Sequence, residues 1–256
     1  MHANQPIGGA LAVATNQIAE LRAFVVSRDL VTIPNTLSSG VRASPPYRGG
    51  DYFSPVGPYE SGGTAYYYVS ANGGGEANRL FVTAHEVMPG HFLQFLHSNQ
   101  APSQVGRLVV TYAFAEGWAH YTEEMMWDAG LGEGNPSVHI GQLAKALLRN
   151  CRYLSAIGLH TQGWTVERSR DLFRDECFQD EGTARQQAAR GTYDPRYLNY
   201  TLGKLQIMRL REDWTATRGG RKAWKAFHDD FLSYGGAPIP LIRQAMMGEA
   251  KPQAKF

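Results

Sequence analysis

Apolar residues recur at helical spacing along most of this chain. From residue 77 onward the period is almost continuous, and only Gly and Pro signals divide it. An earlier apolar stripe predicts a first helix over residues 16–26 and consists of Ile18, Leu21, Phe24 and Val25. The later helices are predicted over residues 77–99, 106–129, 137–160, 165–178, 182–190, 197–217, 220–233 and 238–247.

Residues 29–80 have a different character, because Pro, Gly and Ser punctuate short β-prone pieces such as Ala65–Val69. We predict loops and a small sheet in this region. The run Gly73–Gly75 predicts a turn or loop before the next helix. A phosphate-binding role for this run is not supported, since the lysine of a phosphate-binding loop is missing.

The fold predicted from this pattern is mainly α, a helical bundle with a small β-sheet element near the N-terminal third. A chain of 256 residues can bury one substantial core, so we expect a single domain over residues 1–256. Its parts are an N-terminal helix region over residues 1–28, a loop and small sheet region over 29–80, and a helical core over 81–256.

Composition and charge exclude several classes of partner. The formal net charge of +2 is small and evenly spread, which argues against nucleic-acid binding. No apolar run approaches the roughly 18 residues of a membrane helix, and we see no signal segment, so we expect no membrane partner. Cys151 and Cys177 form no C-x-x-C pair, so we expect reduced core thiols and a cytoplasmic location.

The segment HEVMPGH at residues 85–91 is the strongest chemical signal in the chain. In an H-E-x-x-H motif the histidines stand one helical turn apart and reach one Zn2+ together. On a regular helix the six-residue spacing seen here would turn His91 about 120° away from His85. If Pro89 and Gly90 bulge out of the helix, His91 returns to the angular position that the shorter spacing would give it.

Two carboxylates complete this candidate zinc site. Glu86 would project beside the metal, where it can accept a proton from water. Catalytic zinc also needs a third protein ligand, and Glu116 is the candidate because it stands among small and aromatic residues in a predicted helix. Gly117 would let this helix approach the zinc helix closely. The alternatives are a chance grouping of the two histidines and a solvated Glu116 on an amphipathic helix.

The pairing of HEVMPGHFLQ (residues 85–94) with FAEGWAHYTEE (residues 114–124) resembles a bacterial family. These are the metallopeptidase-like proteins catalogued as domain of unknown function 885, whose signature is H-E-x-x-P-G-H followed by an E-G-W-A helix. The resemblance covers about residues 20 to 215, and it implies site chemistry related to the glutamate-ligand zinc peptidases. Further matching segments are DLVTIP (29–34), SPPY (44–47), YFSP (52–55), TAYYYV (64–69), GLHTQGW (158–164), YTLGK (200–204) and LR (210–211).

The chain departs from the family pattern in two respects. Family members are commonly about twice this length and have a helical N-terminal half. This leaves two alternatives open: a compact version of the fold, or a homo-oligomer or partner subunit that replaces that half. The family also usually carries an aspartate four residues before His160, where this chain has Ala156. If that aspartate orients the histidine, His160 is less firmly held here.

Four further residues are candidates for the site. His160 lies in a family motif and could donate to an oxyanion, with capping or packing as the alternative. Tyr200 could share the oxyanion task, with core packing as the alternative. Glu123 shares a helix face with Glu116 and could orient a ligand histidine or meet a substrate amine. His120 shares this face too, and as a fourth protein ligand it would close the site to substrate.

Two arginines match the family and could bind a substrate carboxylate through two parallel hydrogen bonds. These are Arg190 and Arg211. Structural ion pairing is the alternative, and we expect it for at least one of them.

The function predicted from these residues is metal-assisted hydrolysis of an amide bond in a peptide or small peptide-like substrate. A single Zn2+ held by His85, His91 and Glu116 is the expected cofactor, although such a ligand set also holds other divalent metals. One alternative is a zinc hydrolase or tailoring enzyme that acts on a non-peptide amide or ester. The other is a non-catalytic, metal-stabilised subunit of a larger complex, against which the presence of Glu86 argues.

Overall fold

A computed structural model describes residues 7–34, 38–48, 50–60, 62–71 and 76–256. The described part is mainly helical with one small sheet, which confirms the predicted fold class. The predicted turn at Gly73–Gly75 lies outside the described residues. The helices are α1 (Ile7–Ser27), α2 (Glu76–Glu86), α3 (His91–Ser98), α4 (Gln104–Leu108), α5 (Tyr112–Asp128), α6 (Pro136–Thr161), α7 (Val166–Asp171), α8 (Glu181–Tyr193), α9 (Asn199–Thr215), α10 (Trp224–Ser233) and α11 (Ile239–Met247), with a π-helical turn η1 (Leu172–Glu176) and the 3-10 turns η2 (Pro195–Leu198) and η3 (Gly220–Ala223).

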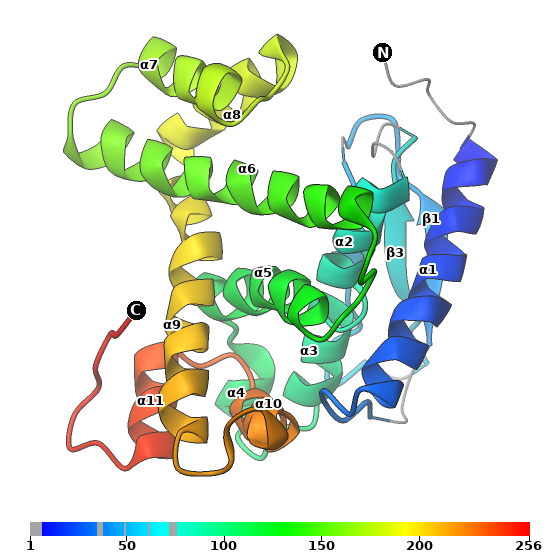
Figure 1. Ribbon diagram of the computed structural model, residues 1–256, viewed down its shortest axis with the longest axis vertical. Coiled ribbons are helices and arrows are strands. Elements are labelled where there is room, and N and C mark those ends of the chain that lie inside the picture. The colour runs from blue at the N-terminus through cyan, green and yellow to red at the C-terminus, as the bar shows by residue number, and fades with distance from the viewer. Residues whose placement is uncertain (1–6, 35–37, 49, 61, 72–75) are drawn as a thin grey trace.

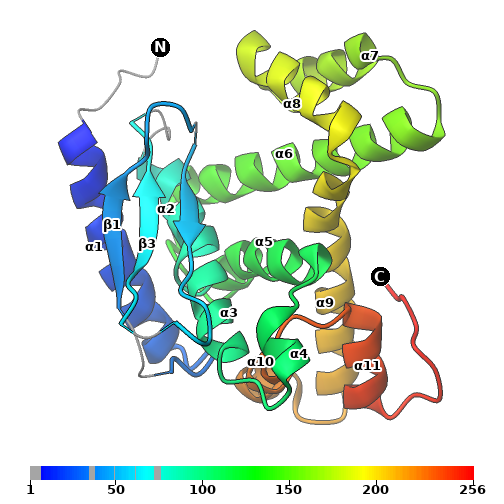
Figure 2. The same ribbon diagram turned by 180° about the vertical axis from the view of Figure 1, so that it is seen from behind.

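The small sheet has three strands in the order β1-β3-β2. Its strands are β1 (Ser39–Ala43), β2 (Tyr52–Ser54) and β3 (Ala65–Val69). Strand β1 pairs parallel to β3, and β2 pairs antiparallel to it with Phe53 opposite Tyr67. Alternate residues of β3 are buried, as expected for a strand with one face on the core. The sheet stands beside α1, at the opposite side of the molecule from α9 (Figure 2).

The predicted helix over residues 77–99 is wrong as a single element, because the chain leaves the helix after Glu86 and starts α3 at His91. The amide of Gly90 donates to the carbonyl of Ala84 at 2.9 Å, which folds the connection back onto the end of α2. A Cβ atom at Gly90 would collide with the carbonyl of His85, so only glycine fits this turn. The expected small bulge is therefore a full break between two helices.

The predicted helix over residues 106–129 is also divided. Between α4 and α5 the chain is extended, and Val110 forms an isolated parallel bridge with Gly236. The amide of Thr111 donates to the Gly236 carbonyl at 2.8 Å, so a tertiary strand-like contact replaces the local helical bonds. Helical spacing of apolar residues could not reveal this, because the competing partner lies more than a hundred residues away.

Helices α5 and α9 approach each other at two glycines. A Cβ atom added at Gly117 would lie 2.6 Å from the Cα atom of Gly203, and one added at Gly203 would lie 2.8 Å from the Cα atom of Gly117. We predicted that Gly117 serves a close approach, but to the zinc helix. The observed partner is α9. Because Glu116 precedes Gly117, this contact fixes the position of Glu116 along α9.

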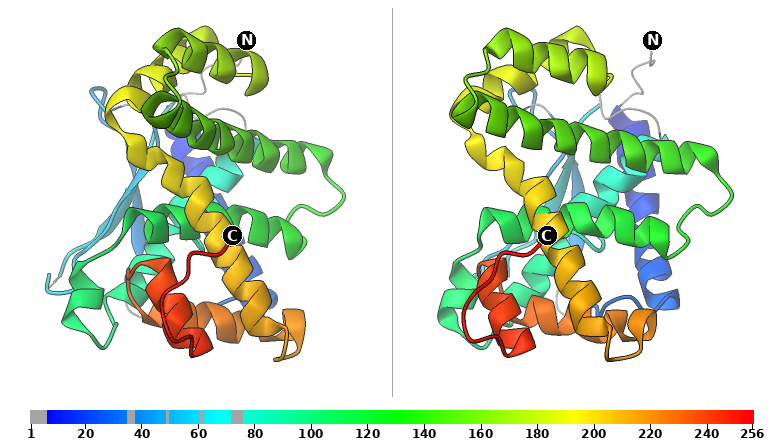
Figure 3. Two further views of the ribbon diagram at one scale, coloured as in Figure 1. Left: turned by 90° about the vertical axis from the view of Figure 1, so that its left-hand side faces the viewer. Right: turned by 60° about the vertical axis from the view of Figure 1, so that its left-hand side comes forward.

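Helix α6 lies above α5 in Figure 1, and α7 and α8 lie on the side of α6 that faces away from α5. Helix α9 runs from this upper group of helices down to α10 and α11 (Figure 3). The larger hydrophobic core joins the sheet to α1, α2, α3, α5, α9, α10 and α11. A second, smaller cluster lies between α6, η1 and α8 and includes Phe173 and Tyr197. Among the described residues, no helix combines the length and the apolar character needed to span a bilayer.

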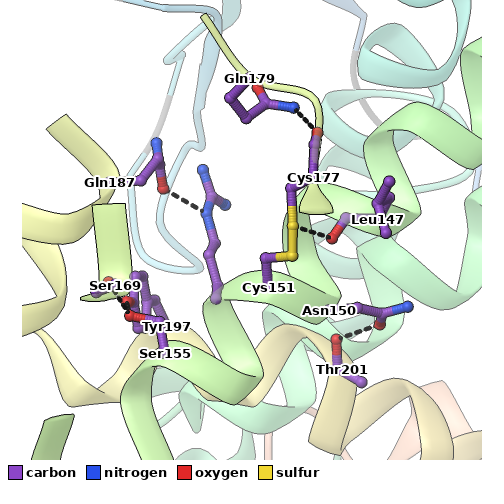
Figure 4. Close-up of a disulfide and its surroundings, with 11 residues drawn as sticks. Leu147, Asn150, Cys151, Ser155, Ser169, Cys177, Gln179, Gln187, Tyr197 and Thr201 are labelled. Atoms are coloured by element: carbon purple, nitrogen blue, oxygen red, sulfur yellow. Dashed lines mark hydrogen bonds between the residues drawn. A yellow bond between two sulfur atoms is a disulfide. The ribbon is translucent and has the colours of Figure 1, made fainter. Parts of the chain in front are cut away.

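Cys151 and Cys177 form a disulfide in this smaller cluster (Figure 4). The prediction of separate reduced thiols is therefore wrong. The π-helical turn η1 brings Cys177 back to α6, where the Cα atoms of the two cysteines lie 6.5 Å apart. The cytoplasmic location was inferred from free thiols, and that argument no longer applies.

Candidate metal centre

The break between α2 and α3 brings the two histidines of the HEVMPGH segment together. His85 lies in the last turn of α2 and His91 begins α3, and their ring centres lie 4.8 Å apart with the rings nearly perpendicular. Glu116 of α5 completes the group, with Oε2 at 3.3 Å from Nε2 of His85 and 3.4 Å from Nε2 of His91. The three ligand atoms lie within 4.8 Å of one another.

These atoms fit a divalent cation. Oε2 of Glu116 is buried and has no hydrogen-bond partner among the described residues, although two imidazole nitrogens lie close to it. Burial alone would raise the pKa of Glu116, but His91 and contacts with His85 hold the pKa of this carboxyl well below its usual range. Two imidazoles and one carboxylate form a ligand set that zinc accepts, with a fourth position left for water or substrate.

The side of the His85 imidazole that faces away from Glu116 contacts a buried ion pair. Its Nδ1 atom lies 2.7 Å from Oε1 of Glu123, a fully buried carboxylate. Arg149 of α6 in turn donates to Oε2 of Glu123 at 2.9 Å. The structure thus places Glu123 against His85, and its predicted role in orienting a ligand histidine stays a prediction. Arg149 was not predicted, since nothing in the sequence links α6 to Glu123.

Glu86 follows the first histidine and lies at the end of α2, where the charges of His91 and Glu116 act on it. Desolvation by burial raises the pKa of Glu86 to about 7, with Glu116 adding to the rise and His91 opposing it. A carboxyl group with a pKa near neutrality is suited to accept and return a proton.

Tyr200 of α9 also lies at this site. Its ring centre is 6.1 Å from that of His85, and the two rings are nearly parallel. Burial and the charge of Glu116 raise the pKa of Tyr200 well above its usual value, so the phenol keeps its proton. The Tyr112 hydroxyl donates to that of Tyr200 at 3.5 Å, which is a long hydrogen bond. The ring of Tyr200 therefore lies beside His85, and its hydroxyl keeps a proton that it can donate.

His120 and His160 are not brought into the ligand group. His120 is completely buried, and neither ring nitrogen has a hydrogen-bond partner among the described residues. Burial and nearby cations hold the pKa of His120 well below its usual range, so its ring is neutral. His160, near the end of α6, has its Nε2 atom 2.8 Å from the carbonyl of Gly191. This contact ties α6 to α8, and an oxyanion role for His160 stays a prediction.

Both predicted arginines are occupied by other groups. Arg190 forms an ion pair with Asp194 at 2.9 Å. Arg211 is buried, donates to the Tyr121 hydroxyl at 3.0 Å and lies over the Trp224 ring. The expected structural ion pairing is observed for Arg190, whereas Arg211 belongs to a buried hydrogen-bond network.

A cavity of about 730 Å3 opens between α2, α6 and the start of α8. None of the three ligand residues lines it. Its wall on α2 includes Asn78 and Val82, and Glu86 continues the same helix face one turn later. Its wall on α6 includes Lys145, one turn before Arg149. The cavity thus lies beside the two helices that carry His85, Glu86 and Arg149.

Two solved structures share this fold. One, from Shewanella oneidensis, is described as a "putative lipoprotein of unknown function" and has 31% identity, a TM-score of 0.82 and coverage of 93% of this chain. Another, from Colwellia psychrerythraea and described as a "putative lipoprotein", has 24% identity, a TM-score of 0.86 and coverage of 97% of this chain. This chain spans 45% and 44% of the length of those two proteins, respectively.

A third structure, described as a "putative oligoendopeptidase F" from Bacillus anthracis, has 16% identity and a TM-score of 0.45 over 95% of this chain and 41% of its own, too little likeness to support an argument. No curated protein matches the chain. The family model described as "Bacterial protein of unknown function (DUF885)" matches residues 8–246. Because that match covers nearly the whole sequence, the chain belongs to this bacterial family of unknown function, DUF885.

Proposed function

We propose that this protein is a metal-dependent hydrolase that cleaves an amide bond in a peptide or peptide-like substrate, with zinc as its metal. The observation that carries the proposal is the convergence of His85, His91 and Glu116, whose ligand atoms lie within 4.8 Å of one another. The charges of His91 and Glu116 also act on a further carboxyl group that follows His85 in the sequence. A structural metal site would have no use for that adjoining carboxyl, Glu86. When bound, zinc would polarise the scissile carbonyl and increase the acidity of the attacking water.

Glu86 accepts the proton of the attacking water and delivers it to the leaving amine. A pKa of about 7 allows both transfers near neutral pH, because the carboxylate and the acid are then close in free energy. Tyr200 donates a hydrogen bond to the oxyanion that forms at the carbonyl. Its raised pKa keeps the phenol protonated, and its ring position beside His85 supports this role.

Glu123 and Arg149 position the centre. Because a carboxylate can only accept hydrogen bonds, Glu123 fixes the Nδ1 proton of His85 and leaves Nε2 free to bind metal. Arg149 balances the charge of the buried Glu123 carboxylate. The cavity beside α2 supplies a volume for substrate residues that extend from Glu86.

The test combines metal analysis with digestion of a peptide library by the wild type, Glu86→Gln and Glu116→Ala. We expect Glu86→Gln to keep its zinc and lose turnover by at least about 100-fold, since only the base is removed. Glu116→Ala should lose affinity for the metal itself. Glu212→Gln, a change at an exposed glutamate of α9, is the matched control and should behave as the wild type.

Equal zinc content in Glu116→Ala and wild type would refute the ligand assignment. A fully zinc-loaded wild type that hydrolyses esters or non-peptide amides but no peptide would show that the substrate class is wrong. A zinc-loaded protein without any hydrolysis would favour a metal-stabilised subunit.

A further inference from the structure

Three arginines lie around the Tyr200 side of the metal centre, and two of them already have carboxylate partners. Arg149 donates to Glu123, and its terminal nitrogen Nη2 lies 2.8 Å from Oε1 of that residue. Arg190 is paired with Asp194. The third is Arg152 of α6, which the sequence did not single out.

Arg152 is close to the site. Its guanidinium carbon lies 5.1 Å from the centre of the Tyr200 ring, and that ring centre lies 6.1 Å from the ring centre of His85. Burial lowers the pKa of Arg152, while the Glu116 carboxylate is near enough to oppose the shift. The guanidinium remains charged in any case, because the pKa of arginine lies far above neutrality.

Among the residues that the structure describes, only one nitrogen of this guanidinium has a hydrogen-bond partner. Nε donates to Oε1 of Gln187 on α8 at 2.9 Å, which fixes the plane of the group. In the described part of the chain, neither terminal nitrogen of Arg152 makes a hydrogen bond and no carboxylate pairs with it. The residues outside that part include no Asp or Glu, so they supply no counter-ion either.

We propose that Arg152 binds a carboxylate of the substrate, close to the bond that is cleaved. The two terminal nitrogens form the fork that matches a carboxylate through parallel hydrogen bonds, and Gln187 holds this fork in place. An extended peptide advances by about 3.5 Å per residue. The Arg152 guanidinium and the His85 ring both lie beside the Tyr200 ring. A substrate carboxylate one or two residues from the metal is therefore within reach of Arg152.

This inference rests on the proposed function for its account of the scissile bond, but it has a test that needs no turnover. The test titrates three probes into zinc-loaded Glu86→Gln protein by calorimetry. They are N-acetyl-Phe-Leu, its C-terminal amide, and N-acetyl-Phe-Asp-amide. We expect the free acid to bind about 10- to 100-fold more tightly than the amide, as for a charged hydrogen-bonded pair.

The third probe separates the two sources of the carboxylate. If only N-acetyl-Phe-Leu shows the tighter binding, the group recognised is a C-terminal carboxylate and the enzyme removes residues from that end. If N-acetyl-Phe-Asp-amide shows it, alone or together with the free acid, an acidic side chain is recognised. Both results support a carboxylate subsite.

Replacement of Arg152 decides whether this residue is responsible. Arg152→Gln, added to Glu86→Gln, should reduce the preference for the acid over the amide to within about threefold, since the charged fork is lost. Gln187→Leu removes the bond to Nε but keeps the guanidinium, so most of the preference should remain. Arg185→Gln alters an exposed ion pair on α8 and should leave the preference unchanged.

Four results would overturn the proposal. Three of them are equal affinity for all three probes, a preference for the carboxylate probes over the amide that persists in Arg152→Gln, and no binding of either carboxylate probe at millimolar concentration. An equal loss in Gln187→Leu and Arg152→Gln would also overturn it, because packing of α8 would then explain the effect. Failure of the proposed function would appear separately, as a zinc-loaded wild type without hydrolysis.

Discussion

The Nδ1 atom of His85 lies 2.7 Å from Oε1 of Glu123, on the opposite side of the imidazole from the nitrogen that faces Glu116 and His91. One short contact thus selects the tautomer of a proposed metal ligand. It also buries a carboxylate whose charge must be balanced, which explains why Arg149 reaches across from α6.

Glu123→Gln should weaken zinc binding by about 10- to 100-fold, because the amide holds the His85 proton less strongly than the carboxylate does. It should also lower the free energy of unfolding by about 3 kcal/mol, since Arg149 is left buried without a counter-ion. Chelator competition measures the first effect and urea unfolding the second. The double variant Glu123→Gln/Arg149→Met should recover stability but not metal affinity; recovery of both would contradict the orienting role.

Gly203→Ala should destabilise the protein by about 1–3 kcal/mol, because the new methyl group would meet the α5 backbone at Ala113 and Gly117. Zinc affinity should fall as well, since α5 carries Glu116. Gly9→Ala in α1 is the matched control. A Cβ atom there meets nothing within 4 Å, so this helical substitution should be neutral or stabilising. Unchanged stability of Gly203→Ala in thermal unfolding would show that the two helices are not in tight contact.

His228 should make stability depend on pH. Its Nδ1 atom lies 2.6 Å from the Leu30 carbonyl and its Nε2 atom 2.7 Å from the Tyr121 hydroxyl, and burial lowers the pKa of His228 to about 3. Below about pH 6.5 the unfolded chain binds a proton here that the folded chain refuses. Stability from this group is therefore complete above pH 6.5 and is lost as the pH falls toward 3.

The measurement is the free energy of unfolding in urea between pH 7 and 4, for wild type and His228→Gln. In this range the wild type should lose up to about 1.4 kcal/mol per pH unit more than the variant. Parallel pH profiles for the two proteins would mean that His228 does not titrate in this way.

Removal of the disulfide should loosen the packing of η1 and α8 against α6. The two cysteines are separated by 26 residues, and loss of a cross-link over a loop of this length costs about 3.5 kcal/mol in the chain-entropy model. Cys177→Ser should lower the unfolding midpoint accordingly, and dithiothreitol should have a similar effect on the wild type only. Two free thiols in the denatured, unreduced wild type would rule out the bond.

The sequence predicted the parts of the site that depend on local geometry. The Pro89-Gly90 pair indicated a distortion of the helix. The spacing of His85 and His91 indicated that this distortion had to turn His91 back toward His85. It could not show the size of the break, because the return of the chain depends on the fit of Gly90 against the end of α2.

The residues that sequence reasoning missed act through tertiary contacts. Arg149 and Arg152 look alike in the sequence of α6, and only the fold shows that one is paired with Glu123 and the other with Gln187. The same holds for Cys151, whose partner arrives through a π-helical turn that apolar periodicity does not report. Arg190 and Arg211 were predicted as substrate-binding residues because they match the family pattern. In the structure Arg190 pairs with Asp194, and Arg211 donates to Tyr121.

The middle of α6 has a consequence for attempts to redesign this protein. This stretch makes three different contacts within four successive positions. Arg149 pairs with the Glu123 carboxylate, Cys151 forms the disulfide with Cys177, and Arg152 donates to Gln187 of α8. Variation of this stretch would disturb several partners at once. Altered selectivity is therefore more accessible through the surrounding residues of α8 and α9, which can change while this short stretch stays constant.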